Sequence, residues 1–497
     1  MENKTKSKVE EIYENCNKNI RNYNSFMNDL FSQLSKKKFS FLKNTKMTKE
    51  EVIANMNENI KILIDYIFKL KETVYKDKYK CLSCIFGAFL GDATGAYCEF
   101  HEPSEENIKK IFIGNPMFGE DPGQVTDDSE MAISSAFAIM DNPEKDNLNS
   151  DYLYYYYGLW HISNPEDEGN TTKKALSKFK ASDFNPNNKN NYEKNFNNIL
   201  KLNYNSLANG FLMRTSPFIV WYYYRFKNQI IETFNKKDNS SELFNLFTKI
   251  EIQAKKDNIC THPNNSLSIA HSIFCIIALG AICGLKPSQI INNVKTLLKN
   301  SFFSKKESMS IRNMINEEIA IYEENKILCQ FKNSFEYFTN RDKNVNTHMG
   351  FYFHAFRLTL YYLFFFNEIK AENHFTKFRV IMNQICSFGG DTDTNAAIVG
   401  TVIGPLIGYK NFGDKEFLKM VSLVPKNRFI YSPGLMVLYI NYLEMNKGNE
   451  ESKIFLTIIL NMMFEKIDPN NLNNFFLIKK TDEGKTNLQT KNKGIKK

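Results

Sequence analysis

The fold is decided by the segment Ser387–Gly408, SFGGDTDTNAAIVGTVIGPLIG, in which two glycines lead into two aspartates spaced two apart. If the backbone is extended here, Asp391 and Asp393 face one point in space. Thr394 then stands at the expected start of a helix, where its hydroxyl can cap the helix or bind a cation. The apolar run that follows carries glycines at helical spacing, which let a neighbouring backbone approach closely. We therefore expect a buried helix with a carboxylate turn at its mouth.

Carboxylates in that position are costly unless a positive charge compensates them, and oxygen ligands favour Mg²⁺, Mn²⁺ or Ca²⁺ over zinc. An EF-hand calcium loop also begins with Asp-x-Asp-x-Asn. Its sixth and twelfth positions are here Ala396 and Val402, so the turn glycine and the closing glutamate are missing. The remaining alternative is a surface turn capped by threonine, which this segment alone does not exclude.

A second acidic segment, GQVTDDSEMAISSAFAIM at residues 123–140, changes the balance. It places Thr126, Asp127 and Asp128 at the start of another amphipathic helix, where acids are also ordinary partners of the helix dipole. With the first turn, it supplies four carboxylates and two hydroxyls. Four negative charges in one pocket would raise one another's pKa, whereas two divalent cations would balance them. The two segments together predict a two-metal site suited to hydrolysis.

The rest of the chain is mostly helical in pattern. We expect an apolar helix over residues 82–90 with an irregular end at Gly91, Asp92 and Gly95. Alternating strand patterns are almost absent. Further helices are expected at Ile311–Ile321, Phe351–Phe366 and Phe375–Cys386, and after the turn in Thr261–Leu285. These patterns predict an all-α fold, a compact multi-helix domain with functional loops at helix mouths.

Three regions follow from the composition along the chain. Residues 1–79 form an expected helical extension of two amphipathic helices, and residues 80–478 form the main domain. Within that domain, residues 183–206 are rich in asparagine without apolar periodicity, so we expect a surface insertion. Residues 479–497 carry seven lysines against Asp482 and Glu483, which is +5 of the formal net charge of +9. This basic tail is expected to be disordered, and no nucleic-acid surface is predicted.

The cysteines and the apolar runs bear on the compartment. Nine cysteines in 497 residues, many within apolar runs, favour buried thiols in a reducing environment. Cys81 and Cys84 form a C-x-x-C pair without the further ligands of a zinc site. No secretory signal is apparent, and the uninterrupted apolar runs are shorter than the ~20 residues of a spanning helix. A cytoplasmic protein without membrane contact is expected, with a nuclear location not excluded.

The order of the motifs resembles that of the ADP-ribosylglycohydrolase family. The resemblance covers the chain from about residue 81 to 408, and neither metal motif alone would be specific. The matching segments are GAFLGDATGAYCEF (87–100), GQVTDDSEMAI (123–133), PEDEGNTTKKAL (165–176), NGFLMRTSPF (209–218), THPN (261–264) and GGDTDTNAAIVGTVIG (389–404).

The resemblance implies an all-helical fold with two Mg²⁺ or Mn²⁺ ions and an ADP-ribosylated protein or ADP-ribose-containing small molecule as the partner. The implied metal ligands are Thr126, Asp127, Asp128, Asp391, Asp393 and Thr394. The implied catalytic residues are Glu99, Asp128 and Asp167, without a choice among them for the general base. The implied contacts of ADP-ribose are Asn209, Gly210, Met213, Arg214 and His262.

The activity implied is hydrolysis of the glycosidic bond between ADP-ribose and a modified side chain or small acceptor. Glu168 departs from the family pattern, in which that position is usually aliphatic, so the departure bears on the substrate. A non-catalytic protein that binds ADP-ribose, or that serves a structural role on the same scaffold, remains an alternative. A dinuclear phosphohydrolase is a second alternative, and the lack of histidine among the candidate ligands disfavours it.

Overall fold

The computed structural model describes residues 76–443, except for 111, 116–118, 143, 145, 181–189, 325–333, 341–343, 413, 424–430, 437–438 and 441–442. The helical extension expected within residues 1–75 and the basic tail expected at residues 479–497 fall outside the described residues. So does part of the asparagine-rich segment.

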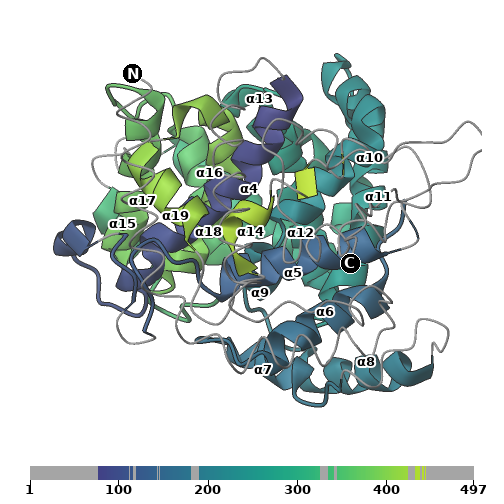
Figure 1. Ribbon diagram of the computed structural model, residues 1–497. Helices are drawn as coiled ribbons and strands as arrows, with labels where there is room; N and C mark the ends of the chain where they lie inside the picture. The colour runs from purple at the N-terminus through teal and green to yellow at the C-terminus, as the bar shows by residue number, and fades with distance from the viewer. Residues whose placement is uncertain are drawn as a thin grey trace, which may run out of the picture.

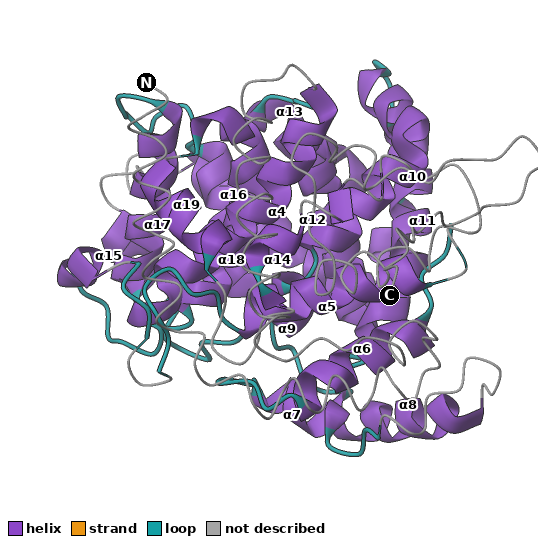
Figure 2. Cartoon of the chain, in the orientation of Figure 1, coloured by secondary structure: helices purple, strands orange, loops and turns teal. Residues whose placement is uncertain are grey.

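The described part of the chain is built from helices, and no strand occurs in it (Figure 2). One isolated antiparallel bridge joins Ala208 to Phe351. The all-α prediction is therefore confirmed. The α-helices are α4 (Lys76–Gly95), α5 (Asp127–Asp141), α6 (Ser150–Ile162), α7 (Asn170–Leu176), α8 (Asn190–Asn203), α9 (Gly210–Met213), α10 (Ser216–Asn235), α11 (Ser240–Asn258), α12 (Asn265–Ile282), α13 (Pro287–Leu298), α14 (Lys306–Glu324), α15 (Ser334–Thr339), α16 (Tyr352–Phe364), α17 (His374–Phe388), α18 (Thr392–Ile407) and α19 (Asp414–Ser422). Short 3-10 helices cover Ala96–Cys98 (η3), Glu105–Lys110 (η4), Ser301–Ser304 (η6), Tyr409–Asn411 (η8) and Pro433–Leu435 (η10).

Helices α4 and α18 lie against each other in the middle of the molecule (Figure 1). Their backbones touch because glycines face each other across the contact. A Cβ atom on Gly87 would lie 2.4 Å from the carbonyl oxygen of Gly400, and one on Gly404 would lie 2.0 Å from that of Ser83. No side chain fits at either distance. The expected close approach of a backbone to the glycine-bearing helix thus occurs, and its partner is α4.

The predicted end of the first helix is wrong. Gly91 and Gly95 do not interrupt α4, which continues to Gly95 before η3 begins. A Cβ on Gly91 would lie 2.2 Å from the carbonyl oxygen of Ala396. These glycines permit contact with α18 and do not break the helix, and a single glycine costs a helix only about 1 kcal/mol.

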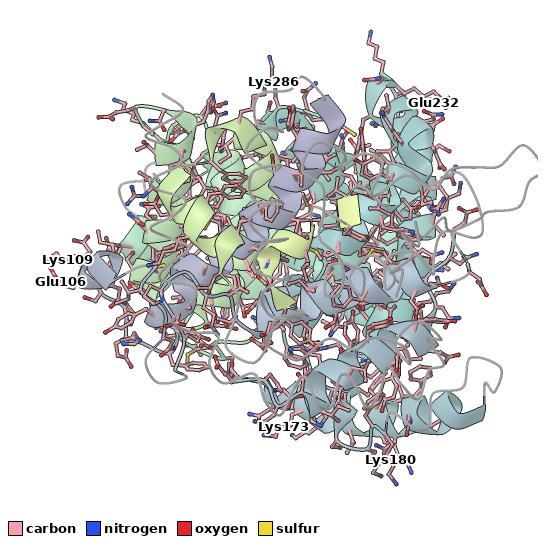
Figure 3. The ribbon with its side chains drawn as sticks, viewed as in Figure 1. Glu106, Lys109, Lys173, Lys180, Glu232 and Lys286 are labelled. Carbon is pink, nitrogen blue, oxygen red and sulfur yellow. The ribbon has the colours of Figure 1, made fainter. Side chains whose placement is uncertain are left out.

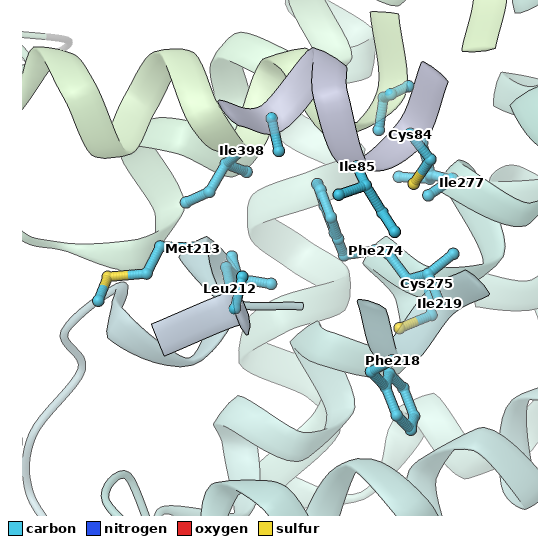
Figure 4. Packing of buried hydrophobic residues seen from close by; sticks show 14 of the residues in the cluster. Cys84, Ile85, Leu212, Met213, Phe218, Ile219, Phe274, Cys275, Ile277 and Ile398 are labelled. Atoms are coloured by element: carbon cyan, nitrogen blue, oxygen red, sulfur yellow. The ribbon is translucent and has the colours of Figure 1, made fainter. Parts of the chain in front are cut away.

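The hydrophobic core lies around α12 and the α4–α18 pair. Figure 4 shows side chains of α4, α9, α10, α12 and α18 meeting at one place, among them Ile85, Phe218, Phe274 and Ile398. Each of these side chains is buried. Since segments far apart in the sequence share this core, their burial also fixes the loops between them.

Two helical stretches within the described residues are long and apolar enough to span a membrane, Tyr79–Cys98 and Asn265–Ile282. In each, most of the apolar window is buried inside the protein, 94% and 89% respectively, and core helices commonly pass this test. The expectation that apolar stretches fall short of a spanning helix therefore holds only for uninterrupted runs. Cys81 and Cys84 on the first stretch are buried free thiols, in line with the prediction for this pair.

Part of the asparagine-rich segment is helical. Residues 190–203 form α8, in which Ile199 is fully buried and Phe196 packs edge-on against Tyr154 with ring centroids 5.7 Å apart. Asn203 is buried and its Nδ2 donates to the carbonyl oxygens of Thr171 and Thr261 at 2.8 and 2.9 Å. Ile199 and Phe196 thus face the rest of the domain, whereas Leu200 and Leu202 on the same helix are exposed.

Charged side chains project from the periphery, as Figure 3 shows for Glu106, Lys109, Lys173 and Lys286. Glu106 and Lys109 pair at 2.5 Å on η4, with about 70% of each side chain exposed. Such exposed pairs contribute little to stability. The charges that matter for the fold are the buried ones.

The packing of α4 on α18 leads to a first prediction. Gly400→Ala should lower the free energy of unfolding by more than about 2 kcal/mol, because the new Cβ would lie 2.1 Å from the carbonyl oxygen of Gly87. Alanine is the better helix former, so any loss reports the helix contact. Chemical denaturation measures it, with Gly169→Ala as the control, because a Cβ there meets nothing within 4 Å. Equal stability of the two variants would contradict the packing argument.

Candidate active site

The two acidic segments predicted from the sequence meet at Asp128. Its Oδ2 accepts hydrogen bonds from Thr126 Oγ1 at 3.0 Å and from Thr394 Oγ1 at 3.2 Å. Asp128 is the second residue of α5 and Thr394 lies in the first turn of α18. The starts of these two helices are thereby joined, and the expected convergence of the segments is present in the structure.

The segment Ser387–Gly408 reaches Asp128 by a different backbone path from the one expected. The chain is not extended through Thr394, because α18 already begins at Thr392 and Asp391 is its N-cap. Asp391 and Asp393 nevertheless converge with Glu99, each offering an oxygen within 4.8 Å of the others. In a first helical turn the side chains at the N-cap and at the second residue can both point past the helix end, so the alternation of an extended chain is not required.

Asp92, which the sequence analysis placed only at the irregular end of a helix, belongs to the same cluster. It is fully buried on α4, and its carboxylate accepts from the backbone N–H groups of Thr126 at 3.0 Å and Ser129 at 3.2 Å. The hydroxyl of Ser129 adds a third donor at 2.5 Å. Asp92 thus caps α5 from another helix, and it also lies within 4.8 Å of oxygens of Asp128 and Asp393.

Burial dominates the electrostatics of the cluster. It raises the pKa of Asp127, Asp128 and Asp393 well above the usual range, and the neighbouring carboxylates raise each of them further. For Asp92, the hydrogen bonds to α5 partly offset burial, and its pKa is raised only to about 6. Such a cluster is stable in its ionised form only beside compensating positive charge.

The donor set fits divalent cations. Asp128 Oδ1 is buried and has no hydrogen-bond partner among the residues that the structure describes, although its other oxygen accepts two hydroxyls. An orphaned carboxylate oxygen of this kind is expected where an ion is bound. Asp92, Asp128 and Asp393 form one candidate group of ligands, and Glu99, Asp391 and Asp393 form a second. All donors are oxygens, which suits Mg²⁺ or Mn²⁺.

Glu99 is held in the site by backbone hydrogen bonds between the loop that follows it and the turn at Gly389 and Gly390. Phe100 N donates to the carbonyl oxygen of Gly390 at 2.7 Å, and Gly390 N donates to that of His101 at 3.2 Å. Gly389 and Gly390 both have positive φ, and a Cβ on Gly389 would lie 2.3 Å from the His101 carbonyl oxygen. The double glycine therefore lets this loop reach Glu99. Burial, together with nearby aspartates, raises the pKa of Glu99 to about 10.

A cavity of about 330 Å³ opens onto the acidic cluster. Nine residues predicted for the site line it, namely Glu99, Asp127, Asp167, Asn209, Gly210, Met213, His262, Asp391 and Thr394. Thr126, Asp128 and Asp393 are buried and are not among its lining residues. Gly350 also lines the cavity, and no motif in the sequence indicated it. Its carbonyl oxygen accepts from Asn209 N at 2.9 Å, which brings the loop before α16 to the cavity wall.

Two residues predicted to contact ADP-ribose have other partners. Asn209 lines the cavity, but its Nδ2 donates to Asp391 Oδ2 at 2.6 Å and so orients a candidate metal ligand. Arg214 does not line the cavity. Its fully buried guanidinium pairs with Asp257 at 3.2 Å and lies 4.3 Å from the ring centroid of Tyr157. The implied contact of Arg214 with ADP-ribose is therefore replaced in the structure by a contact with a carboxylate.

His262 and Asp167 both line the cavity. His262 Nδ1 lies 2.8 Å from Thr261 Oγ1, and burial lowers the pKa of the imidazole well below its usual value, so the ring is neutral. A Cβ on Gly210 would lie 2.8 Å from the ring, which explains the glycine. Burial raises the pKa of Asp167, and the charge of Glu168 raises it further.

Glu168, the departure from the family pattern, also lines the cavity. Its Oε1 lies 2.7 Å from His161 Nδ1 on α6, and 8% of its side chain is exposed. The partner of this additional carboxylate is thus supplied by the same chain.

The comparison with known families identifies the fold. A sequence model of the family described as ADP-ribosylglycohydrolase matches residues 73–419. The chain belongs to the ADP-ribosylglycohydrolase family. The resemblance inferred from the motifs is therefore confirmed.

The individual proteins that match the chain have low sequence identity to it, between 16% and 29%. A protein of Acanthamoeba polyphaga mimivirus, which is also named as an ADP-ribosyl glycohydrolase, is 27% identical over 339 residues, covering 65% of this chain and 86% of its own. An ADP-ribosyl-[dinitrogen reductase] glycohydrolase of Rhodospirillum rubrum is 29% identical over 104 residues, which are 20% of this chain and 34% of its own. A solved ADP-ribosylglycohydrolase-related protein complex contains a chain 16% identical, with 71% and 99% of the two chains aligned and a TM-score of 0.41.

The raised carboxylate pKa values lead to a second prediction, for metal-stripped protein. Folding raises the pKa of Glu99 from 4.5 to about 10, so its contribution to stability is present below pH 4.5 and is lost as the pH rises through about 10. The melting temperature should fall across this interval, and less steeply for Glu99→Gln. Mg²⁺ should flatten the fall, because it stabilises the ionised carboxylates. Thermal unfolding at several pH values measures this, and identical slopes for the two proteins would contradict it.

Proposed function

We propose that the protein hydrolyses the glycosidic bond between C1 of the distal ribose of ADP-ribose and a modified protein side chain or small acceptor. The observation that carries the proposal is the opening of the acidic cluster onto the cavity, since its lining includes carboxylates of the cluster together with Gly210, Met213 and His262. Family membership supports the same reaction class. The nature of the group attached to C1 is left open.

The residues that would hold two divalent cations are Thr126, Asp127, Asp128, Asp391, Asp393 and Thr394, with Glu99 and Asp92 beside them. When bound, such cations balance the buried negative charge and acidify water. Asn209 keeps Asp391 in position, and Asp92 keeps the start of α5 in position. Asn209 thus orients a ligand without touching an ion, whereas Asp92 is also within reach of an ion held by Asp128 and Asp393.

The proton transfers fall to residues that face the cavity. As the bond from C1 to the leaving group breaks, a water oxygen forms a bond to C1 and its proton passes to a carboxylate. Glu99 suits this role better than Asp128, because Glu99 lines the cavity while Asp128 is fully buried. Without cations the raised pKa of Glu99 would keep it protonated, so the role requires bound cations that favour its ionised form. The leaving group needs a proton, and Asp167, whose pKa is raised by burial, faces the same space and would supply it.

A third prediction tests the function directly. Incubation with ADP-ribosylated protein and Mg²⁺ should release ADP-ribose, measured by chromatography. Asp391→Asn should slow release by at least about a hundredfold, and Asn209→Ala by about ten- to a hundredfold, because it removes only the hydrogen bond to Asp391. Glu106→Gln is the matched control, since this carboxylate is exposed on η4 and its loss should leave release unchanged.

The outcomes separate the rival functions. Full turnover by Asp391→Asn would contradict the assignment of the site. Release of AMP or phosphate in place of ADP-ribose would indicate a phosphohydrolase. Metal-dependent binding of ADP-ribose without any release from arginine-, serine- or O-acetyl-linked substrates would indicate a binding protein on the same scaffold.

A further inference from the structure

Two segments that are far apart in the sequence line the cavity over the acidic cluster and touch each other there. Gly210 and Met213 of α9 belong to the first, and His262, which follows the end of α11, belongs to the second. A Cβ on Gly210 would lie 2.8 Å from the His262 ring. Since the two segments are already in contact, a small change in their spacing alters the shape of the cavity.

A buried ion pair joins the ends of α9 and α11. Arg214 directly follows α9, and Asp257 lies in the last turn of α11. Nε and Nη2 of Arg214 lie 3.3 and 3.2 Å from Asp257 Oδ2, and Nη2 also donates to the Asp257 carbonyl oxygen at 3.4 Å. Tyr157 supports the pair, because its hydroxyl donates to Asp257 Oδ1 at 2.5 Å. The planar guanidinium thus holds both the side chain and the backbone at the end of α11.

A second contact between the same two helix ends runs through His271 of α12. Its Nε2 is hydrogen-bonded to Thr215 Oγ1, and its Nδ1 lies 3.0 Å from Asn258 Oδ1. Burial lowers the pKa of His271 to about 4, so the neutral ring donates from one nitrogen and accepts at the other. Thr215 follows Arg214 and Asn258 follows Asp257, so the two contacts act side by side.

The position of His262 depends on that of Asn258. The backbone N–H groups of Thr261 and His262 both donate to the Asn258 carbonyl oxygen, at 3.1 and 2.6 Å. On the other side of the contact, α9 has only four residues, and helices of that length are not stable by themselves. The spacing between α9 and His262 is therefore fixed by what their neighbours bind.

Direct contact between Arg214 and ADP-ribose is the alternative role for this arginine. Its side chain is buried and does not line the cavity. Nη1, which pairs with no described residue, is buried as well. The guanidinium therefore does not reach a ligand in the cavity as the structure has it.

We propose that Arg214 and His271 are positioning residues, which fix α9 relative to His262 and thereby set the affinity for ADP-ribose without touching it. The proposal rests on the proposed function, because it takes ADP-ribose as the occupant of the cavity. Its physical content is preorganisation, since groups held in place before binding lose less freedom when the ligand arrives.

Calorimetric titration of the Mg²⁺-loaded full chain with ADP-ribose tests the proposal. Arg214→Lys keeps the charge opposite Asp257 but loses the planar fork, and His271→Leu removes the second contact. Each should raise the Kd of ADP-ribose about tenfold, because binding groups that are displaced by a fraction of an ångström fit the ligand less well. The Kd of Mn²⁺ should stay unchanged, because Asn209, which orients Asp391, is held separately through the Gly350 carbonyl oxygen.

A third variant separates positioning from direct contact. Tyr157→Phe keeps the ring beside Arg214 and removes only the hydrogen bond to Asp257. It should also raise the Kd of ADP-ribose. Combined with Arg214→Lys, it should raise the Kd by less than the product of the two single effects, because both changes act through Asp257.

Val294→Ala is the control for a general loss of stability. Val294 is fully buried on α13, and no residue of α13 lines the cavity. Loss of its two methyl groups should lower the melting temperature and leave the Kd of ADP-ribose unchanged. Far-ultraviolet circular dichroism verifies that each variant is folded at the temperature of the titration.

The outcomes separate this proposal from the proposed function. If the unchanged chain binds ADP-ribose and Arg214→Lys and His271→Leu bind it equally well, the positioning role is overturned. If Arg214→Lys alone weakens binding and the other two variants do not, direct contact replaces it. Binding without hydrolysis would overturn the proposed activity alone, whereas no binding by the unchanged chain would overturn both.

Discussion

The mutual repulsion of buried carboxylates is the constraint on which the rest of this structure depends. Asp92, Asp128 and Asp393 offer oxygens within 4.8 Å of one another, and each is almost completely buried. Only one oxygen of Asp128 is satisfied by hydroxyl donors. A fold that holds this arrangement must obtain its stability elsewhere, and it requires cations for its ionised form.

The packing of α4 on α18 supplies that support. Glycines at the contact allow the two backbones to touch, and the contact continues to Gly95, where a Cβ would lie 2.5 Å from the backbone of Asp393. The same two helices therefore form the centre of the core and carry carboxylates of the cluster. Asp92 then fixes the start of α5 through the backbone N–H groups of Thr126 and Ser129, so that a third segment is tied to the pair.

The meeting of the two acidic segments could be predicted from the sequence, because unpaired carboxylates at buried helix starts are unfavourable wherever they occur. The role of Asp92 could not be predicted in this way. Its partners are backbone N–H groups 34 and 37 positions away, and the residue types at those positions do not reveal the contact. Gly91 and Gly95 were misread as helix breakers for the same reason, since the partner helix decides their role. In α8, a few apolar positions outweighed an asparagine-rich composition.

The central claim is that the buried acids hold two divalent cations, and anomalous diffraction from crystals grown with Mn²⁺ tests it most directly. The account predicts two anomalous peaks, one beside the orphaned Oδ1 of Asp128 and one between Glu99, Asp391 and Asp393. In Asp128→Asn crystals the first peak should weaken or disappear. Absence of any peak among these carboxylates at saturating Mn²⁺, with the cluster as compact as described, would contradict the account.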